Sequence, residues 1–294
     1  MTPDKLRELR RLRMVSSRMV TSIFAGEFRS VFRGRGIEFD EVREYQPGDD
    51  VRAIDWNVTA RSGRPFVKRY VEERERTLFF IVDASPSTFF GTSGRPKSRL
   101  AAEVCALLSY AALRNRDRVG LLLFTDRAEA LVPPGKGERH VLRVVRTLLT
   151  TTPQGCGTDL AGALERAGRL LRPGTVVFVI SDFHAPDFRR PLALLHARHD
   201  VVAIPITDRV ETEFPDCGVV TLRDAETGAR ITVDMASPAC REEFRRAADR
   251  ARAGLREVFR SLGVDSVELS GDDDYRRALM AFFRMREERR RRRP

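Results

Sequence analysis

The sequence predicts an α/β fold in which a mostly parallel central sheet carries helices on both faces, beside a small β-rich N-terminal subdomain. From Thr77 onward, wholly apolar segments of strand length alternate with amphipathic segments of helical period. That alternation is typical of parallel strands buried on both faces. Residues 26–76 differ, since apolar and polar residues alternate there around Gly-rich turns, which indicates β-structure with hairpins.

The first 25 residues form a separate segment. Apolar residues recur at helical spacing between positions 12 and 24 and are flanked by arginines. A basic amphipathic helix can lie on a membrane surface. Apolar stripes of this kind are more often faces that pack on the protein's own core. We therefore expect an N-terminal helix over residues 1–25 that docks on the α/β core.

The alternation of strand-like and helical segments defines the remaining domain boundaries. We expect the core over residues 77–210, the C-terminal part of the same α/β domain over 211–283, and an Arg-rich tail over 284–294. The expected core strands are LFFIV, VGLLLF, EALV, VVFVI and VVAIPI, with helices over 98–116, 138–149, 159–171 and 187–198. A weaker strand pair near 219–234, a long helix over 237–262, the strand VDSVEL and a last helix complete the domain.

Composition excludes several classes of protein. With 42% hydrophobic residues among 294, the chain has the composition of a folded protein. No apolar run reaches 18 residues and no signal-peptide pattern opens the chain, so we expect a cytoplasmic protein without a transmembrane segment. The four cysteines form no CxxC pair, which argues against structural zinc and against a disulfide framework.

Net charge is +11, and residues 284–294 contribute +5 of it through seven arginines and two glutamates. Such a tail can contact nucleic acid or an anionic membrane surface. It lacks the interleaved aromatic residues on which single-stranded bases stack, and charge runs are often only solvated. A basic nucleic-acid or membrane-surface binder is therefore an alternative interpretation, with nucleic acid disfavoured.

Two of the predicted core strands end at an aspartate. LFFIV leads directly into Asp83, and VVFVIS leads into Asp182. Ligands of open parallel sheets bind just outside the carboxyl ends of the strands, so these two carboxylates can converge. Ser85 and Ser87 follow Asp83 in DASPS, and Thr158 lies in the Gly-rich segment GCGTDL. Hydroxyl and carboxylate oxygens suit Mg²⁺ or Mn²⁺ and are poor ligands for zinc or copper.

The order DxSxS, then threonine, then aspartate resembles the metal-ion-dependent adhesion site of von Willebrand type A (vWA) domains, which have a Rossmann-like fold. The resemblance implies that a metal is held by Asp83, Ser85, Ser87, Thr158 and Asp182. The three hydroxyls would bind it directly or through water, and the two aspartates mostly through ordered waters. An open sixth position would accept an Asp or Glu side chain from a protein partner.

A second resemblance covers most of residues 26–205. The segment GRGIEFDEVREYQPGDDVRAIDWNVTARSGRPFVKRYVEERE is similar to the signature that vWA proteins of domain-of-unknown-function family 58 carry directly before the DxSxS strand. Longer members begin with transmembrane helices, and this sequence shows none. The resemblance implies a non-enzymatic adaptor that works with a MoxR-type AAA+ ATPase to engage or remodel a client protein.

Two enzymatic interpretations compete with this one. GTSGRPKS follows the first core strand, where a nucleotide-binding loop would lie, but it lacks the glycine directly before Lys97. We therefore expect Lys97 only to begin a helix. A divalent-metal-dependent hydrolase is the other alternative, because a bound metal can activate water. No GxSxG motif is present and His184 is the only histidine near the proposed site, so we expect no catalytic residues.

Overall fold

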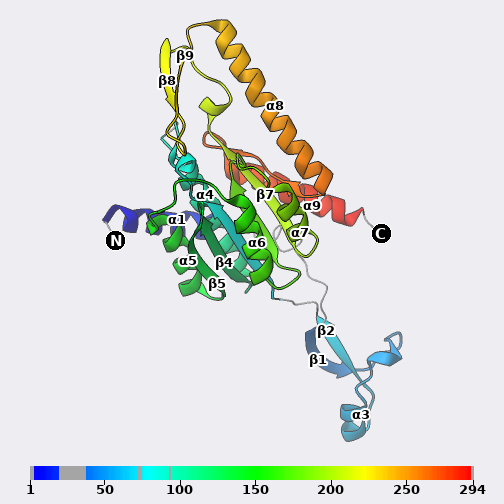
Figure 1. Ribbon diagram of the computed structural model, residues 1–294. Helices are drawn as coiled ribbons and strands as arrows, with labels where there is room; N and C mark the ends of the chain where they lie inside the picture. Colours follow the sequence, from blue (N-terminus) through cyan, green and yellow to red (C-terminus); the bar gives the residue numbers. More distant parts are fainter. Residues whose placement is uncertain (1–2, 20–37, 72–74, 93, 293–294) are drawn as a thin grey trace. The chain divides into compact units, whose positions relative to one another are not determined.

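The computed structural model describes residues 3–19, 38–71, 75–92 and 94–292. The chain divides into two compact units, a smaller one of residues 32–76 and a larger one that combines residues 1–31 with 77–294. The larger unit holds a seven-stranded sheet with helices packed against it (Figure 1). The predicted α/β fold with a mostly parallel central sheet is confirmed.

The strands of the large sheet follow the order β10–β7–β6–β3–β4–β5, and β11 also pairs with β7. Neighbours are parallel except for β4 and β5, so the strand predicted near EALV is an antiparallel edge strand. The two most central strands, β6 and β3, are buried at every position except Thr77, as strands covered on both faces are. The strands span Thr77–Asp83 (β3), Arg118–Phe124 (β4), Ala128–Gly135 (β5), Val176–Ser181 (β6), Asp200–Thr207 (β7), Asp265–Ser266 (β10) and Leu269–Ser270 (β11).

Helices cover both faces of this sheet. The helices are α1 (Pro3–Met19), α4 (Lys97–Arg114), α5 (Glu138–Thr150), α6 (Leu160–Leu170), α7 (Arg189–His196), α8 (Pro238–Leu262) and α9 (Tyr275–Arg291). On one face, α6, α7 and the end of α8 pack with Phe79 and Ile81 of β3 in a single apolar cluster. On the other, α4 packs with α5 and α1, whose Leu12 is buried. The N-terminal helix therefore docks on the core, and its predicted residues 20–25 lie outside the described residues.

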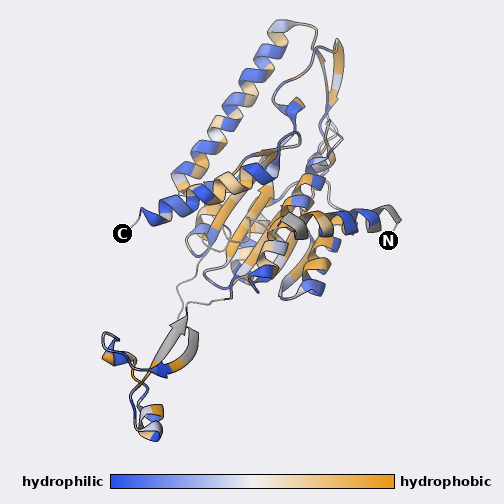
Figure 2. Cartoon of the chain, turned by 180° about the vertical axis from the view of Figure 1, so that it is seen from behind, coloured by the Kyte–Doolittle hydropathy of each residue, from blue (hydrophilic) through white to orange (hydrophobic). Residues whose placement is uncertain are grey.

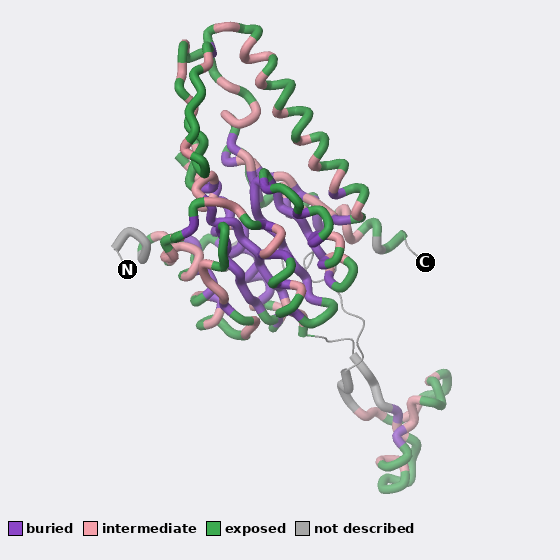
Figure 3. Tube along the Cα trace, viewed as in Figure 1, coloured by how far each residue is buried: buried purple, intermediate pink, exposed green. Residues whose placement is uncertain are grey.

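Strands β8 (Val219–Arg223) and β9 (Arg230–Asp234) form a separate antiparallel pair within the larger unit. They lead into α8, where the Oγ atom of Ser237 accepts a hydrogen bond from the backbone N–H of Cys240 at 3.5 Å and caps the helix. Only the last turns of α8 reach the core, through Phe259 and its neighbours, and the rest of this helix is largely exposed (Figure 3).

Apolar residues gather on the central strands, while the outer helices alternate apolar and polar faces (Figure 2). Side chains of neighbouring strands pack closely: a Cβ atom added at Gly120 of β4 would lie 2.7 Å from the ring of Phe79 on β3. Among the described helices, none is both long enough and apolar enough to cross a membrane.

The smaller unit pairs β1 (Glu38–Glu44) with β2 (Phe66–Val71) in an antiparallel sheet. Between them lie a short 3₁₀ turn, η2 (Val51–Ala53), and helix α3 (Trp56–Ser62), which the sequence did not predict. The carboxylate of Asp55 caps α3 by accepting the backbone N–H of Asn57 at 3.0 Å. The segment expected to form a hairpin with β1, residues 26–37, lies outside the described residues.

Truncating Phe178 tests this core. Phe178 of β6 is fully buried and stacks on Phe80 of β3, with ring centroids 5.6 Å apart. Phe178→Ala should lower the free energy of unfolding by about 3–5 kcal/mol, as buried Phe cavities do, measured by urea unfolding followed by far-UV circular dichroism. The control Ile231→Ala changes an exposed side chain on β9 and should cost less than about 0.5 kcal/mol. Similar losses in the two variants would contradict the assignment of the core.

Candidate functional site

Four of the five predicted site residues meet at one edge of the sheet. Strands β3 and β6 are parallel neighbours, with Val82 opposite Ile180. Asp83 ends β3, and Asp182 follows the last residue of β6, so both carboxylates lie at the carboxyl ends of adjacent strands. Both are buried, with 2% of Asp83 and 6% of Asp182 exposed. The convergence expected from the strand ends is therefore present.

A continuous set of hydrogen bonds joins these residues. Asp83 accepts the backbone N–H of Ser85 at 2.8 Å through Oδ1 and the hydroxyl of Ser181 at 2.7 Å through Oδ2. The Oγ atoms of Ser85 and Ser87 lie 3.1 Å apart, and Ser87 donates to Oδ2 of Asp182 at 2.8 Å. The DxSxS turn thus bends back toward β6, and its two hydroxyls lie beside the second carboxylate.

Thr158 lies at the same edge but hydrogen-bonds elsewhere. The backbone N–H of Asp159, which begins α6, donates to the carbonyl of Thr125, the residue after β4, at 2.8 Å. The hydroxyl of Thr158 donates to Oε1 of Glu226 at 2.5 Å rather than to the other four residues. The loop before it packs tightly, because a Cβ atom at Gly155 would collide with the side chains of Thr125 and Asp126. Only glycine fits there.

A strained residue supports the position of Asp182. Phe183 has a φ of 58°, in the left-handed region that bulky side chains rarely adopt. Its ring is held by edge-to-face packing on Phe188 and Phe259, with centroids 5.5 Å and 5.1 Å away. Its backbone N–H donates to the Ser181 hydroxyl at 3.0 Å. Packing of this ring in the core therefore holds the chain reversal that presents Asp182 at the sheet edge.

Lys97 belongs to the site, which the sequence analysis missed. It begins α4 as expected, but only 3% of it is exposed, and its ammonium donates to Oδ2 of Asp182 at 3.0 Å and to Oε1 of Glu211 at 2.7 Å. The expectation that Lys97 only begins a helix is wrong. A signal was present in the composition: the chain has four lysines against 49 arginines. A compact ammonium fits a narrow buried position that a planar guanidinium does not.

These contacts shift the pKa values of the two aspartates in opposite directions. Burial, and then the charge of Asp182, raise the pKa of Asp83 from its ordinary 3.8 to about 6. Burial also raises the pKa of Asp182, but the Lys97 ammonium, the nearby His184 and the hydrogen bonds outweigh it, and the pKa of that carboxyl is lowered. Asp182 therefore stays ionised, whereas Asp83 is the group whose charge is costly.

The donor set fits a hard divalent cation. In an octahedral Mg²⁺ site with oxygens about 2.1 Å from the ion, neighbouring oxygens lie about 3.0 Å apart, close to the 3.1 Å between the Ser85 and Ser87 hydroxyls. Lys97 pairs with two carboxylates, Asp182 and Glu211, and Asp83 lies near Asp182, so the cluster carries a net charge of −2 when all of them are ionised. Among the described residues, no group of three or more His, Cys, Asp or Glu side chains is arranged to hold a metal. A cation here would depend on the hydroxyls.

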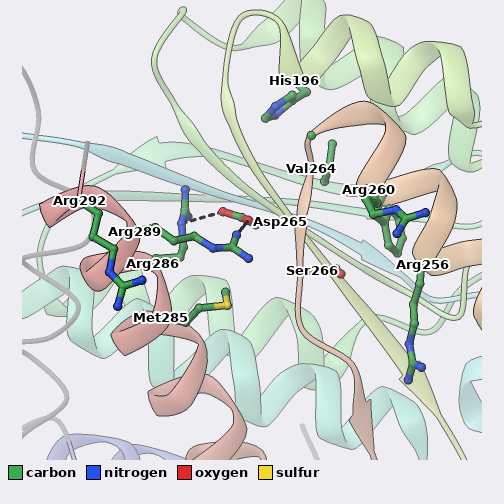
Figure 4. A pocket seen from close by; sticks show the side chains of 12 residues that line it. His196, Arg256, Arg260, Val264, Asp265, Ser266, Met285, Arg286, Arg289 and Arg292 are labelled. Carbon is green, nitrogen blue, oxygen red and sulfur yellow. Dashed lines mark hydrogen bonds and ion pairs between the residues drawn. The ribbon is translucent and has the colours of Figure 1, made fainter. Parts of the chain in front are cut away.

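A large cavity of about 1060 Å³ is lined by other residues, at the ends of α7 and α8, on β10 and on α9 (Figure 4). Arginines dominate its wall, but the chain's own carboxylates bind them. Asp265 pairs with Arg286 and with Arg289 at 3.0 Å each, and Glu268 binds Arg256 at 2.5 Å. Two arginines of the predicted tail are thus engaged in ion pairs with the α/β domain.

Residues 41–254 match the family model described as "Protein of unknown function DUF58". The chain belongs to this family. A relative from Mycobacterium tuberculosis, "Uncharacterized protein Rv1480", is 35% identical over 289 residues, covering 97% of this chain and 90% of the relative.

Two other proteins are similar to shorter segments of this chain. "Uncharacterized protein YeaD" of Bacillus subtilis is 28% identical over 107 residues, covering 36% of this chain and 25% of that protein. The "Magnesium-chelatase 60 kDa subunit" of Cereibacter sphaeroides is 37% identical over 102 residues, covering 34% of this chain and 17% of that protein. A solved structure, BatB from Bacteroides thetaiotaomicron, aligns with 72% of this chain and 99% of its own, with a TM-score of 0.47 and 15% identity.

The raised pKa of Asp83 predicts a pH dependence of stability. The folded state holds the Asp83 proton more tightly than the unfolded state, so ionising it costs stability as pH rises from about 4 to 6. Asp83→Asn cannot ionise and should escape this cost, which is about 3 kcal/mol for a shift of this size. In metal-free protein, the variant's stability relative to the native chain should therefore increase between pH 4 and 6.5, measured by urea unfolding. Parallel curves would contradict the assignment.

Proposed function

We propose that this DUF58 protein is a non-enzymatic, metal-dependent protein-binding adaptor of the vWA type. Mg²⁺ or Mn²⁺ would bind at Asp83, Ser85, Ser87, Thr158 and Asp182, and an Asp or Glu of a partner would complete its coordination. The observation that carries the proposal is the buried cluster in which the Ser85 and Ser87 hydroxyls lie together beside Asp182 at a parallel-sheet edge. Ligands bind at this edge in open α/β sheets.

The charge of the cluster supports a cation over an anionic substrate. An excess of two negative charges remains after Lys97 is counted, so one divalent ion would neutralise it. Lys97 would keep Asp182 ionised before an ion binds and would then compete with that ion for the carboxylate. The ion's chemistry would be to offer a Lewis-acidic position that prefers a carboxylate oxygen.

A partner protein, rather than a small substrate, fits this site better. A metal hydrolase needs a base that can take a proton from water. His184, the histidine nearest the site in sequence, is exposed and hydrogen-bonds Asp182 through its backbone N–H at 3.3 Å. The identity of the ATPase partner, a MoxR-type AAA+ protein, and of a client it remodels, rests on the family resemblance. The similarity to a magnesium-chelatase subunit supports a role inside an assembly.

The basic-tail alternative is less well supported. Arg286 is largely buried and pairs with Asp200 at 2.7 Å, so part of the tail serves the fold. Binding of nucleic acid by the remaining arginines would require a phosphate-tracking groove with stacking side chains. An anionic membrane surface remains the second candidate for these charges.

Metal binding is the direct test of the proposal. Saturable Mn²⁺ binding, followed by electron paramagnetic resonance with Mg²⁺ as competitor, should occur in the native chain and weaken at least about 100-fold in Asp83→Ala, which loses a buried carboxylate of the site. The control Asp249→Ala removes a carboxylate exposed on α8 and should bind as the native chain does. Binding that survives Asp83→Ala would exclude this site.

Removing the ammonium makes a second, opposite prediction. Lys97→Met should tighten Mn²⁺ binding, because even at the dielectric constant of water a unit charge about 5 Å from a divalent ion costs about 1.7 kcal/mol, roughly tenfold in affinity. The same variant should unfold at lower urea, since Asp182 loses a buried partner. Isothermal titration calorimetry measures the affinity. Weaker binding in Lys97→Met would mean that the lysine organises the site more than it competes with the ion.

A further inference from the structure

The tip of the β8–β9 hairpin reaches the proposed metal site. Glu226 lies in the turn between the two strands, and its Oε1 accepts the hydroxyl hydrogen of Thr158 at 2.5 Å, although the two residues are 68 positions apart in the chain. Thr158 is the proposed metal ligand that makes no hydrogen bond to the other four. A carboxylate of the chain itself thus lies beside one of the proposed ligands.

The turn presents this side chain in a defined way. Oδ1 of Asp224 accepts the backbone N–H groups of Glu226 and Thr227, each at 2.8 Å. Gly228 adopts a φ of 72°, and its N–H donates to the carbonyl of Asp224 at 3.0 Å, which closes the turn. These bonds fix the backbone of Glu226, so its carboxylate is held at the tip by local structure.

The rest of the hairpin is poorly buried. Val219 is 69% exposed and Ile231 is 62% exposed, and among the described strands β8 and β9 pair only with each other. A two-stranded hairpin is marginally stable on its own. At its base, the backbone N–H of Met235 donates to the carbonyl of Gly218 at 2.9 Å, and Met235 is buried. The hairpin is therefore anchored at the base, and the Glu226 contact restrains its tip.

We propose that Glu226 is the chain's own ligand for the open coordination position of the metal. Its carboxylate lies beside the proposed ligand Thr158. The two oxygens, 2.5 Å apart, would have to separate to about 3.0 Å to bind neighbouring positions of one ion. An acidic side chain of a partner must then displace Glu226, and the hairpin tip moves away when it binds. This inference rests on the proposed metal function and adds to it a specific residue and the chemistry of the competing partner.

The experiment uses Mn²⁺ alone as the probe, with the full chain and Glu226→Gln. Water-proton relaxation counts the exchangeable waters on bound Mn²⁺, and Glu226→Gln should gain one water and bind Mn²⁺ about tenfold more weakly. Hydrogen exchange should show that Mn²⁺ protects residues 219–234 in the native chain and not in the variant. Glu243→Gln, an exposed change on α8, is the matched control and should behave as the native chain.

The outcomes distinguish the existence of the metal site from the role of Glu226 in it. If the native chain and Glu226→Gln bind Mn²⁺ with the same affinity, water count and hairpin exchange, the metal site stands and the role of Glu226 is overturned. If neither binds Mn²⁺ while both are folded, the proposed function fails and this inference fails with it. Gain of a water, weaker binding and loss of hairpin protection together support Glu226 as the internal ligand.

Discussion

Repulsion between two buried carboxylates is the constraint on which the site depends. Asp83 and Asp182 lie close together because β3 and β6 pair in parallel and each aspartate stands at the carboxyl end of its strand. Burial in a medium of low dielectric makes two such charges costly together. Lys97 neutralises the charge of Asp182, and hydroxyl and backbone donors stabilise the charge of Asp83. The cost that remains appears as the raised pKa of Asp83. The proposed divalent ion would relieve the remaining cost at neutral pH.

The residues around these carboxylates are tightly packed. Phe183 keeps an unfavourable backbone angle, held by Phe188 and Phe259, so that Asp182 points to the sheet edge. Gly155 has no space for a side chain beside Thr125, which fixes the loop that leads to Thr158. The strained backbone of Phe183 lowers the stability of the fold. Strained residues cluster at functional sites, so this cost is consistent with a functional role for the sheet edge.

The predictable part of this protein is the part encoded by local pattern. Wholly apolar strands that end at Asp83 and Asp182 predict a parallel sheet and the edge where its ligands bind, and the structure brings Ser85 and Ser87 to the same place. Lys97 and Glu226 were not predicted, because Lys97 contacts Asp182 across 85 residues of chain and Glu226 contacts Thr158 across 68, and only the tertiary fold determines such contacts. Helix α3 was missed for a different reason: its start depends on the Asp55 cap within a segment whose alternation favours strands.

Two side chains of opposite charge, Lys97 and Glu226, would adjust the affinity of the proposed site for its ion. In the proposed site, buried Lys97 would weaken cation binding, and Glu226 beside Thr158 would strengthen it. The most direct test of this account is anomalous diffraction from crystals grown with Mn²⁺. The account predicts a single peak about 2.1 Å from the Ser85 and Ser87 hydroxyl oxygens. Well-ordered crystals with no Mn²⁺ peak between these serines, or with Mn²⁺ bound only elsewhere, would contradict it.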